Sequence, residues 1–139
     1  GATLYRALEA AKVLEEKYGM SAEVIDARSL VPFNYEKVLA SVKKTGRIVI
    51  AGDATARGSF LNDLARNVNE LAFDYLDAPA VVLGSRDWIT PAYELEYAFF
   101  PQPDSFLDII HEKIVPLQGY VPTRNYTDAE QIRRAKEGI

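Results

Sequence analysis

The 139-residue sequence contains no cysteine and a single histidine, His111. The lack of cysteine excludes disulfides, thiolate metal sites and a cysteine nucleophile, and one histidine cannot form a histidine metal cluster. Basic residues are also few, because 16 lysines and arginines stand against 20 acidic residues and leave a net charge of −4. This charge gives no electrostatic reason to expect nucleic acid or an anionic membrane surface as a partner.

Long apolar runs are missing as well. No stretch approaches the roughly 20 apolar residues of a membrane span, and no signal peptide opens the sequence. We therefore expect no membrane association and a cytoplasmic protein, with an organelle matrix as the alternative location. The remaining composition, 48% hydrophobic and 26% charged, is typical of one globular domain with a substantial core.

Residues 22–53 organise the rest of the chain. Two apolar runs, 22–27 and 47–51, contain neighbouring β-branched residues without polar alternation, which is typical of strands covered on both faces. The segment between them, 35–44, has apolar residues on one helical face and charged residues on the other. A strand, a helix and a strand in this order form a crossover unit, so the sequence predicts a parallel sheet.

The segments on either side of this unit predict further helices and one more buried strand. The helices are expected at residues 3–18, 60–75, 94–100 and from Asp104 or Ser105 to 115, and the strand at 80–84. Asn34 is positioned to cap helix 35–44, and Gly19 and Gly46 follow two helix ends, where a left-handed residue is favoured. Because a helix at the start of the chain feeds a buried strand, we expect another strand upstream of Gly1, in a longer polypeptide. The expected fold class is α/β, with a mainly parallel sheet between two layers of helices.

Residues 118–139 differ in character from the rest of the chain. They are polar, and Thr127 and Glu130 form a capping box for a last helix that has little apolar face. We therefore expect a domain at 1–117 and a C-terminal extension at 118–139 that lies on the surface or across a partner.

The loop Gly52–Ser59 is the most site-like stretch. It links a predicted strand to a helix N-terminus, where open parallel sheets bind ligands and free N–H groups attract anions. Arg57 and Ser59 could hold an anion there, but Ser59 is also a simple helix N-cap. Five residues separate Gly52 from Gly58 and no lysine follows, which departs from a phosphate-binding loop. A cap and turn is favoured over a small-molecule site, and both interpretations stay open.

Arg86, Asp87 and Trp88, with Tyr93 nearby, follow the predicted strand 80–84 and should reach the same sheet edge as the first loop. An exposed tryptophan beside arginine and tyrosine is typical of protein interfaces. The alternative is a tryptophan that folds back over the edge of the sheet. The residues alone favour neither interpretation.

No residue pattern predicts catalysis. Asp53 has the position of a receiver-domain phosphoacceptor, but no Lys-Pro pair appears where the last strand would end. His111 has Asp108 and Glu112 nearby, without a nucleophile or metal ligand, so we expect it to be solvated or locally paired. We therefore predict no catalytic, cofactor-binding or metal-binding residue, and a domain that supports or binds.

A series of motifs runs in one order over residues 1–117. They are Ala7–Ala11, Glu23–Asp26, Arg28–Leu30 with Pro32, Ser41–Arg47, Phe73–Pro79, Gly84, Asp87, Pro91 and Leu95–Glu96 ahead of Pro101. Together these motifs resemble the C-terminal domain of the beta subunit of thiamine-diphosphate-dependent 2-oxo acid dehydrogenases. The pyruvate, branched-chain 2-oxo acid and acetoin enzymes belong to that family.

The resemblance implies a transketolase C-terminal fold, with one antiparallel edge strand and a first strand that ends at Gly1. It implies that thiamine diphosphate and Mg²⁺ are held outside this chain, by the alpha subunit and the beta N-terminal domain. The whole enzyme would decarboxylate a 2-oxo acid and pass the acyl group to a lipoyl arm. This domain, without activity of its own, would hold the alpha–beta assembly together and help to dock the lipoyl acyltransferase core. We expect the subunit-facing edge to be lined by Asp53, Arg57, Ser59, Arg86, Asp87 and Trp88.

The sequence departs from the family in its loops. Gly52-Asp53 stands where the family usually has Glu-Glu, and Gly58-Ser59-Phe60-Leu61 stands where it has Gly-Gly-Phe-Gly. Of the frequent Asp-x-Pro-x-Pro-Tyr pattern only Asp87 and Pro91 remain, and the tail after Leu117 is longer than usual. These changes affect the assignment of substrate and docking rather than the fold. The alternatives are the same domain of another thiamine enzyme, such as transketolase or deoxyxylulose-phosphate synthase, and a stand-alone flavodoxin-like or receiver-like binding module.

Overall fold

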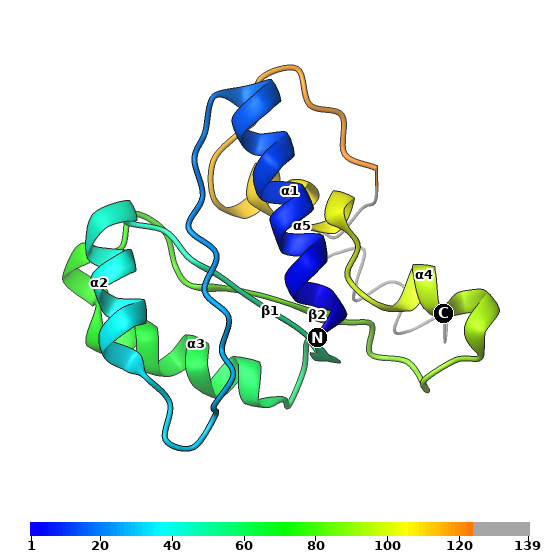
Figure 1. Ribbon diagram of the computed structural model, residues 1–139, viewed down its shortest axis with the longest axis horizontal. Coiled ribbons are helices and arrows are strands. Elements are labelled where there is room, and N and C mark those ends of the chain that lie inside the picture. The colour runs from blue at the N-terminus through cyan, green and yellow to red at the C-terminus, as the bar shows by residue number, and fades with distance from the viewer. Residues whose placement is uncertain (124–139) are drawn as a thin grey trace.

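The computed structural model describes residues 1–123 and shows a small parallel sheet covered by helices on both faces (Figure 1). Its elements are α1 (Ala2–Tyr18), α2 (Tyr35–Thr45), β1 (Val49–Thr55), α3 (Phe60–Leu71), a 3₁₀ turn η1 (Phe73–Tyr75), β2 (Val81–Ser85), a 3₁₀ turn η2 (Tyr93–Leu95), α4 (Glu96–Phe99) and α5 (Pro103–Lys113). Within residues 1–123 the predicted helices and two of the three predicted strands are therefore present.

The two strands run parallel, as the crossover pattern predicts. Val49 pairs with Val81 and Ala51 with Leu83, and the register shifts between Ala51 and Thr55. The strands approach closely at Gly84, where an added Cβ would lie only 2.5 Å from the carbonyl oxygen of Ala54. Only glycine tolerates such a close backbone approach. The residues after Gly52, predicted as loop, continue β1 to Thr55.

Alternate residues from Ile48 into β1 face opposite layers of helices. Val49 and Ala51 pack with α1 and α5 in a cluster around Phe106 and Ile109. Ile48 and Ile50 pack with α2 and α3 in a second cluster, which contains Val38, Val42, Val68 and Ala72. This alternation confirms the three-layer arrangement of helices, sheet and helices, with apolar side chains on both faces of the sheet.

A third cluster joins α1 and α5 to the segment that follows α5. Leu14, Leu107 and Leu117 are its buried members. The first and last described helices therefore pack together in two apolar clusters, this one and the cluster around Phe106 and Ile109.

The helix ends follow the predicted capping chemistry in most places. The Lys37 N–H donates to Asn34 Oδ1 at 3.2 Å, and Gly19 and Gly46 adopt left-handed φ values of 64° and 71°. The predicted start of α5 is wrong, because neither Asp104 nor Ser105 is the N-cap. Gln102 caps this helix in a reciprocal capping box with Ser105, since Pro103 fits the first helical position and has no N–H to satisfy.

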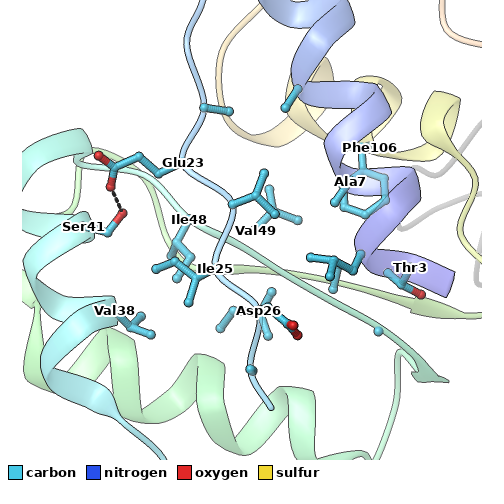
Figure 2. Close-up of a pocket in the computed structure, with 18 of the residues that line it drawn as sticks. Thr3, Ala7, Glu23, Ile25, Asp26, Val38, Ser41, Ile48, Val49 and Phe106 are labelled. Atoms are coloured by element: carbon cyan, nitrogen blue, oxygen red, sulfur yellow. Dashed lines mark hydrogen bonds between the residues drawn. The ribbon is translucent and has the colours of Figure 1, made fainter. Parts of the chain in front are cut away.

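The main departure from the sequence-based expectation is residues 22–27. They are extended but form no strand, and within residues 1–123 no backbone hydrogen bond joins them to β1. Side-chain hydrogen bonds anchor this segment to α2 instead, because the Glu23 carboxylate accepts from Ser41 (Figure 2) and Lys44. The stretch has strand-like sequence, but a strand needs a hydrogen-bonding partner at its edge, and none of the described residues supplies one.

Within residues 1–123 the sheet has only these two parallel strands, so the antiparallel edge strand expected from the resemblance is not found in this part of the chain. The predicted last helix, after Thr127, lies outside the described residues. In the same described part, no helix has the length and apolar character required to cross a bilayer.

Candidate functional site

The carboxyl ends of β1 and β2 meet at one edge, as parallel pairing requires, and bring two predicted site residues together. Arg57 follows β1 and Asp87 follows β2, and Arg57 Nη1 lies 3.5 Å from Asp87 Oδ2. Both side chains are more than half exposed, so the pair contributes little to folding stability. An exposed ion pair of this kind is available to a partner.

Arg86 and Trp88 form the second part of this edge. The Arg86 backbone N–H donates to the carbonyl of Phe99 at 3.1 Å, and its Nε donates to the carbonyl of Ala98 at 3.4 Å. The guanidinium lies 5.5 Å from the centre of the Trp88 ring, which is 6.3 Å from the ring of Phe99. The half-buried tryptophan thus packs against its own chain, the arrangement expected of a ring folded back over the sheet edge.

The segment that follows Trp88 exposes several large apolar side chains. We call this surface the 89–97 patch, and its members are Ile89, Tyr93, Leu95 and Tyr97. Ile89 is 93% exposed, more than any other large apolar residue in the described part of the chain. An exposed apolar surface of this kind, beside charged residues, is typical of a protein–protein contact.

Asp53 lies at the same end of β1 but turns toward α1. Its Oδ1 accepts a hydrogen bond from Thr3 and lies 3.7 Å from Arg6 Nη1. Arg6 Nη1 also donates to the carbonyl of Pro101 at 2.9 Å. Asp53 therefore holds the start of α1 on the end of β1, and the structure does not bring it together with the Arg57–Asp87 pair.

Ser59 occupies the N-cap position of α3 without the expected capping bond. Its Oγ is buried and has no hydrogen-bond partner among the described residues. The loop before it is braced by Thr55 Oγ1, which donates to the Arg57 carbonyl at 2.8 Å, and by Asn62 Nδ2, which donates to the Ala56 carbonyl at 2.9 Å. These bonds make the loop a closed turn, in line with the cap-and-turn interpretation.

The sequence analysis missed a buried polar cluster on α5. Asp108 is only 2% exposed, and its carboxylate accepts hydrogen bonds from the Tyr120 hydroxyl at 2.5 Å and from the Thr123 N–H at 2.9 Å. Burial, followed by the hydrogen bond to Asp108, raises the pKa of Tyr120 above its ordinary value of 10.0. The available signal was an aspartate between Leu107 and Ile109, inside an otherwise apolar run.

His111, next to this cluster, is locally paired as expected. Its Nδ1 accepts a hydrogen bond from the Leu117 N–H at 2.8 Å, and its ring lies 5.4 Å from that of Tyr120. Among the residues that the structure describes, no group of three His, Cys, Asp or Glu side chains could hold a metal ion. The sheet edge offers charge, aromatic rings and exposed apolar area.

The family model of the transketolase C-terminal domain matches residues 1–106. The chain belongs to this family. Among its curated relatives, the chain is 39% identical over 108 residues to "Pyruvate dehydrogenase E1 component subunit beta" of Leifsonia xyli, an alignment that covers 78% of this chain and 32% of the relative. It is 43% identical over 94 residues to "2-oxoisovalerate dehydrogenase subunit beta" of Pseudomonas aeruginosa, with 67% and 26% covered.

A third relative carries a different activity in its name. The chain is 36% identical over 113 residues to "Acetoin:2,6-dichlorophenolindophenol oxidoreductase subunit beta" of Bacillus subtilis, with 81% of this chain and 33% of the relative covered. The chain thus spans about a third or less of the length of these relatives. All three are beta subunits, and the family and fold expected from the motifs are confirmed.

Proposed function

We propose that this chain is the C-terminal domain of the beta subunit of a thiamine-diphosphate-dependent 2-oxo acid dehydrogenase, or of a fused equivalent. The observation that carries the proposal is the match of one stretch to beta subunits named for pyruvate, 2-oxoisovalerate and acetoin enzymes. The complete enzyme decarboxylates a 2-oxo acid oxidatively and transfers the acyl group to a lipoyl arm. It acts in the cytoplasm or in an organelle matrix.

The cofactor of this enzyme belongs outside the chain. Mg²⁺ takes oxygen ligands, from carboxylates and from the diphosphate that it bridges. Residues 1–123 contain no group of three potential ligands, and the loop after β1 is a turn closed by its own hydrogen bonds. We assign the cofactor to the alpha subunit and the beta N-terminal domain, as the resemblance to the family implies.

The role of this domain is assembly. The 89–97 patch supplies exposed apolar area, and the Arg57–Asp87 pair supplies charges of both signs beside it. Partners with complementary charge find such an edge faster, and apolar area at its centre slows their release. We assign this edge to the contact with the alpha subunit or the rest of the beta subunit. Docking of the lipoyl acyltransferase core is a further role of the assembled enzyme.

The test is assembly and turnover of the complete enzyme with changes in this edge. Ile89→Asp places a charge in the apolar centre and should weaken alpha–beta association at least tenfold, with a parallel loss of 2-oxo acid turnover at low enzyme concentration. Arg57→Ala removes a rim charge and should mainly slow association and reduce its salt dependence. Light scattering and decarboxylation assays measure both effects.

The matched control is Phe73→Asp. Phe73 is also highly exposed, but it precedes β2 and so lies at the amino ends of the strands, opposite the proposed contact. Wild-type assembly and turnover in Ile89→Asp would contradict the assembly role. Turnover of a sugar phosphate, in place of any 2-oxo acid, would assign the chain to a transketolase or deoxyxylulose-phosphate synthase instead.

A further inference from the structure

The C-terminal extension is tied to α5 at Thr123, the last residue that the structure describes. The Thr123 N–H donates to Asp108 Oδ1 at 2.9 Å, and its hydroxyl lies 3.1 Å from Asp108 Oδ2 and 3.2 Å from Asp104 Oδ2. The Tyr120 hydroxyl donates to the same Asp108 carboxylate. Asp108 is buried, so water does not compete strongly for these bonds. The chain beyond Thr123 therefore starts from a fixed point on the first two turns of α5.

This fixed point adjoins the elements that carry the 89–97 patch. Tyr93 and Leu95 belong to η2 and Tyr97 to α4, and only three residues separate the end of α4 from the start of α5. A linker of four residues, 124–127, spans up to about 14 Å when it is extended. Residues 128–139 can therefore reach the patch without any movement of the described elements.

The sequence of residues 128–139 predicts a helix with one narrow apolar stripe. Its capping box consists of Thr127 and Glu130. Positions spaced by three or four residues share one face of a helix, and here they are Ala129, Ile132, Ala135 and Ile139. Arg133 and Lys136 each stand four positions after a residue of this stripe, so they border it. A helix this short is stable only when another surface covers its stripe.

The 89–97 patch matches this helix in both apolar character and charge. Its four members are exposed, and Glu94 and Glu96 are exposed between them. No lysine or arginine occurs from residue 87 to residue 112. The acidic groups attract the arginine and the lysine that border the stripe, and arginine also stacks well on tyrosine rings.

A second group of exposed apolar residues is less suitable. It consists of Leu71, Phe73 and Tyr75. This group already holds a cation, because Lys43 Nζ lies 4.9 Å from the centre of the Tyr75 ring. It also stands at the amino ends of the strands, opposite the end at which α5 begins. The positive charges of residues 133–136 therefore favour the 89–97 patch.

We propose that residues 128–139 dock as a helix on the 89–97 patch of their own chain. A four-residue linker gives the helix an effective concentration in the millimolar range, so a contact too weak to join separate molecules is populated within one chain. The helix then covers the surface that the proposed function gives to the assembly partner, and the two compete for it. This competition rests on the proposed function, whereas the docking does not.

The test of docking is a disulfide trap in the complete beta polypeptide, without the alpha subunit. Ile132→Cys places a thiol in the middle of the stripe. The second thiol is placed on the patch in turn, by Ile89→Cys, Tyr93→Cys or Leu95→Cys. Residues 1–139 contain no cysteine, so each pair is unique within this domain. A disulfide spans Cα atoms up to about 7 Å apart, and we expect at least one pair to form it within one chain under mild oxidation.

Two matched controls use the same chemistry. Phe73→Cys with Ile132→Cys pairs the stripe with the other exposed apolar group, and no cross-link is expected. Arg134→Cys replaces Ile132→Cys in the second control. Positions two apart on a helix do not share a face, so this thiol should not reach the patch.

Charge reversal tests the choice of surface. Arg133→Glu should lower the yield of the disulfide about threefold, because it meets Glu94 and Glu96 with a like charge. Arg134→Glu makes the same change away from the stripe and should leave the yield unchanged. Glu96→Arg should restore the yield in the Arg133→Glu background.

Competition is measured on assembly. Deletion of residues 124–139 keeps Thr123 with its hydrogen bonds to α5. It should raise the apparent affinity of the beta subunit for the alpha subunit at least about threefold, because the partner no longer displaces a cover. Unchanged affinity after the deletion would overturn the competition.

The docking is overturned if none of the three patch positions forms a disulfide with Ile132→Cys. Disulfide-linked dimers in place of cross-links within one chain would also overturn it, since the occupant would then be the extension of a second copy. A cross-link within one chain, together with normal assembly of Ile89→Asp, would leave the docking standing while the proposed function fails. No cross-link, together with weakened assembly of Ile89→Asp, would give the reverse.

Discussion

Strand-like stretches lie on both edges of β1, but only one of them pairs with it. On one side β2 pairs with β1, and Leu83 is buried between the strands and α5. On the other side residues 22–27 run past β1 without a hydrogen bond, and Ile25 stays 40% exposed. Both stretches contain a pair of neighbouring β-branched residues, Val24–Ile25 and Val81–Val82, so this strand-forming pattern does not separate them.

The difference teaches that burial of a strand depends on its neighbours in the sheet rather than on its own residues. β2 pairs with β1, whereas residues 22–27 face a cavity (Figure 2) and pair with no strand in the described part of the chain. Changes at the two edges should therefore have unequal effects.

The largest effect is expected from truncation at the paired edge. Leu83→Ala should lower the free energy of unfolding by about 3 kcal/mol, because it removes buried contacts and leaves a cavity. In the 139-residue chain, Ile25→Ala should cost less than about 1 kcal/mol, because much of the side chain is already in contact with solvent. Chemical denaturation of both variants measures the contrast. Equal losses would mean that the open edge is as well packed as the paired one.

The next largest loss of stability is expected where the paired strands approach closely. Gly84→Ala should cost about 2–3 kcal/mol, because the new methyl group would lie 2.6 Å from the Ala56 nitrogen and force the strands apart. Gly1→Ala is the control, since its Cβ would meet only Asp53 Oδ2, at 3.7 Å. A stable Gly84→Ala variant with unchanged strand pairing by NMR would disprove the close approach.

A somewhat smaller loss of stability is expected from the buried polar cluster on α5. Asp108→Ala should cost about 2 kcal/mol, because the Tyr120 hydroxyl and the Thr123 N–H lose a buried acceptor. Thermal unfolding measures the loss. Glu112→Ala, on the exposed face of the same helix, should change stability by less than about 0.5 kcal/mol. Similar melting temperatures for the two variants would show that the hydrogen bonds to Asp108 do not stabilise the fold.

The smallest effect appears only in alkali. The pKa of Tyr120 is raised in the folded protein, so above pH 10 the unfolded chain loses this proton while the folded chain keeps it. Stability should therefore fall as the pH rises from 10 towards the folded pKa, and the slope should be flatter in Tyr120→Phe. Tyr5→Phe, at an exposed position, is the control. Identical slopes of stability against pH in all three proteins would contradict the shift.

The elements that sequence alone predicts here are those whose causes are local. Asn34 and Gly46 mark the ends of α2 because a cap depends on residues a few positions away. The state of residues 22–27 depends on a partner strand, and no local pattern shows whether that partner is present. The predicted start of α5 is wrong for a local reason. Pro103 occupies the first turn, so the N-cap is Gln102 and Asp104 lies inside the helix.

The position of the candidate site was predictable from the sequence, but the orientation of its side chains was not. Parallel topology alone brings the loops after the two strands to one edge, and the Arg57–Asp87 pair is found there. The orientation of a side chain was not predictable, as Asp53 shows by turning to Thr3 on α1. The burial of Asp108 was not predictable, because an acidic residue on a helix is usually solvated. Its hydrogen-bond partners also lie more than ten positions further along the chain.

The contact between Arg6 and the carbonyl of Pro101 has a consequence for biosynthesis. It joins residues 95 positions apart, and Ala10 of the same helix packs on Phe106 and Ile109. During translation, α1 emerges before α5 but cannot reach its final position until α5 has been made. Such long sequence separation slows folding and makes the two ends of the chain order together. Among the described helices, the first to be made is therefore among the last to be secured.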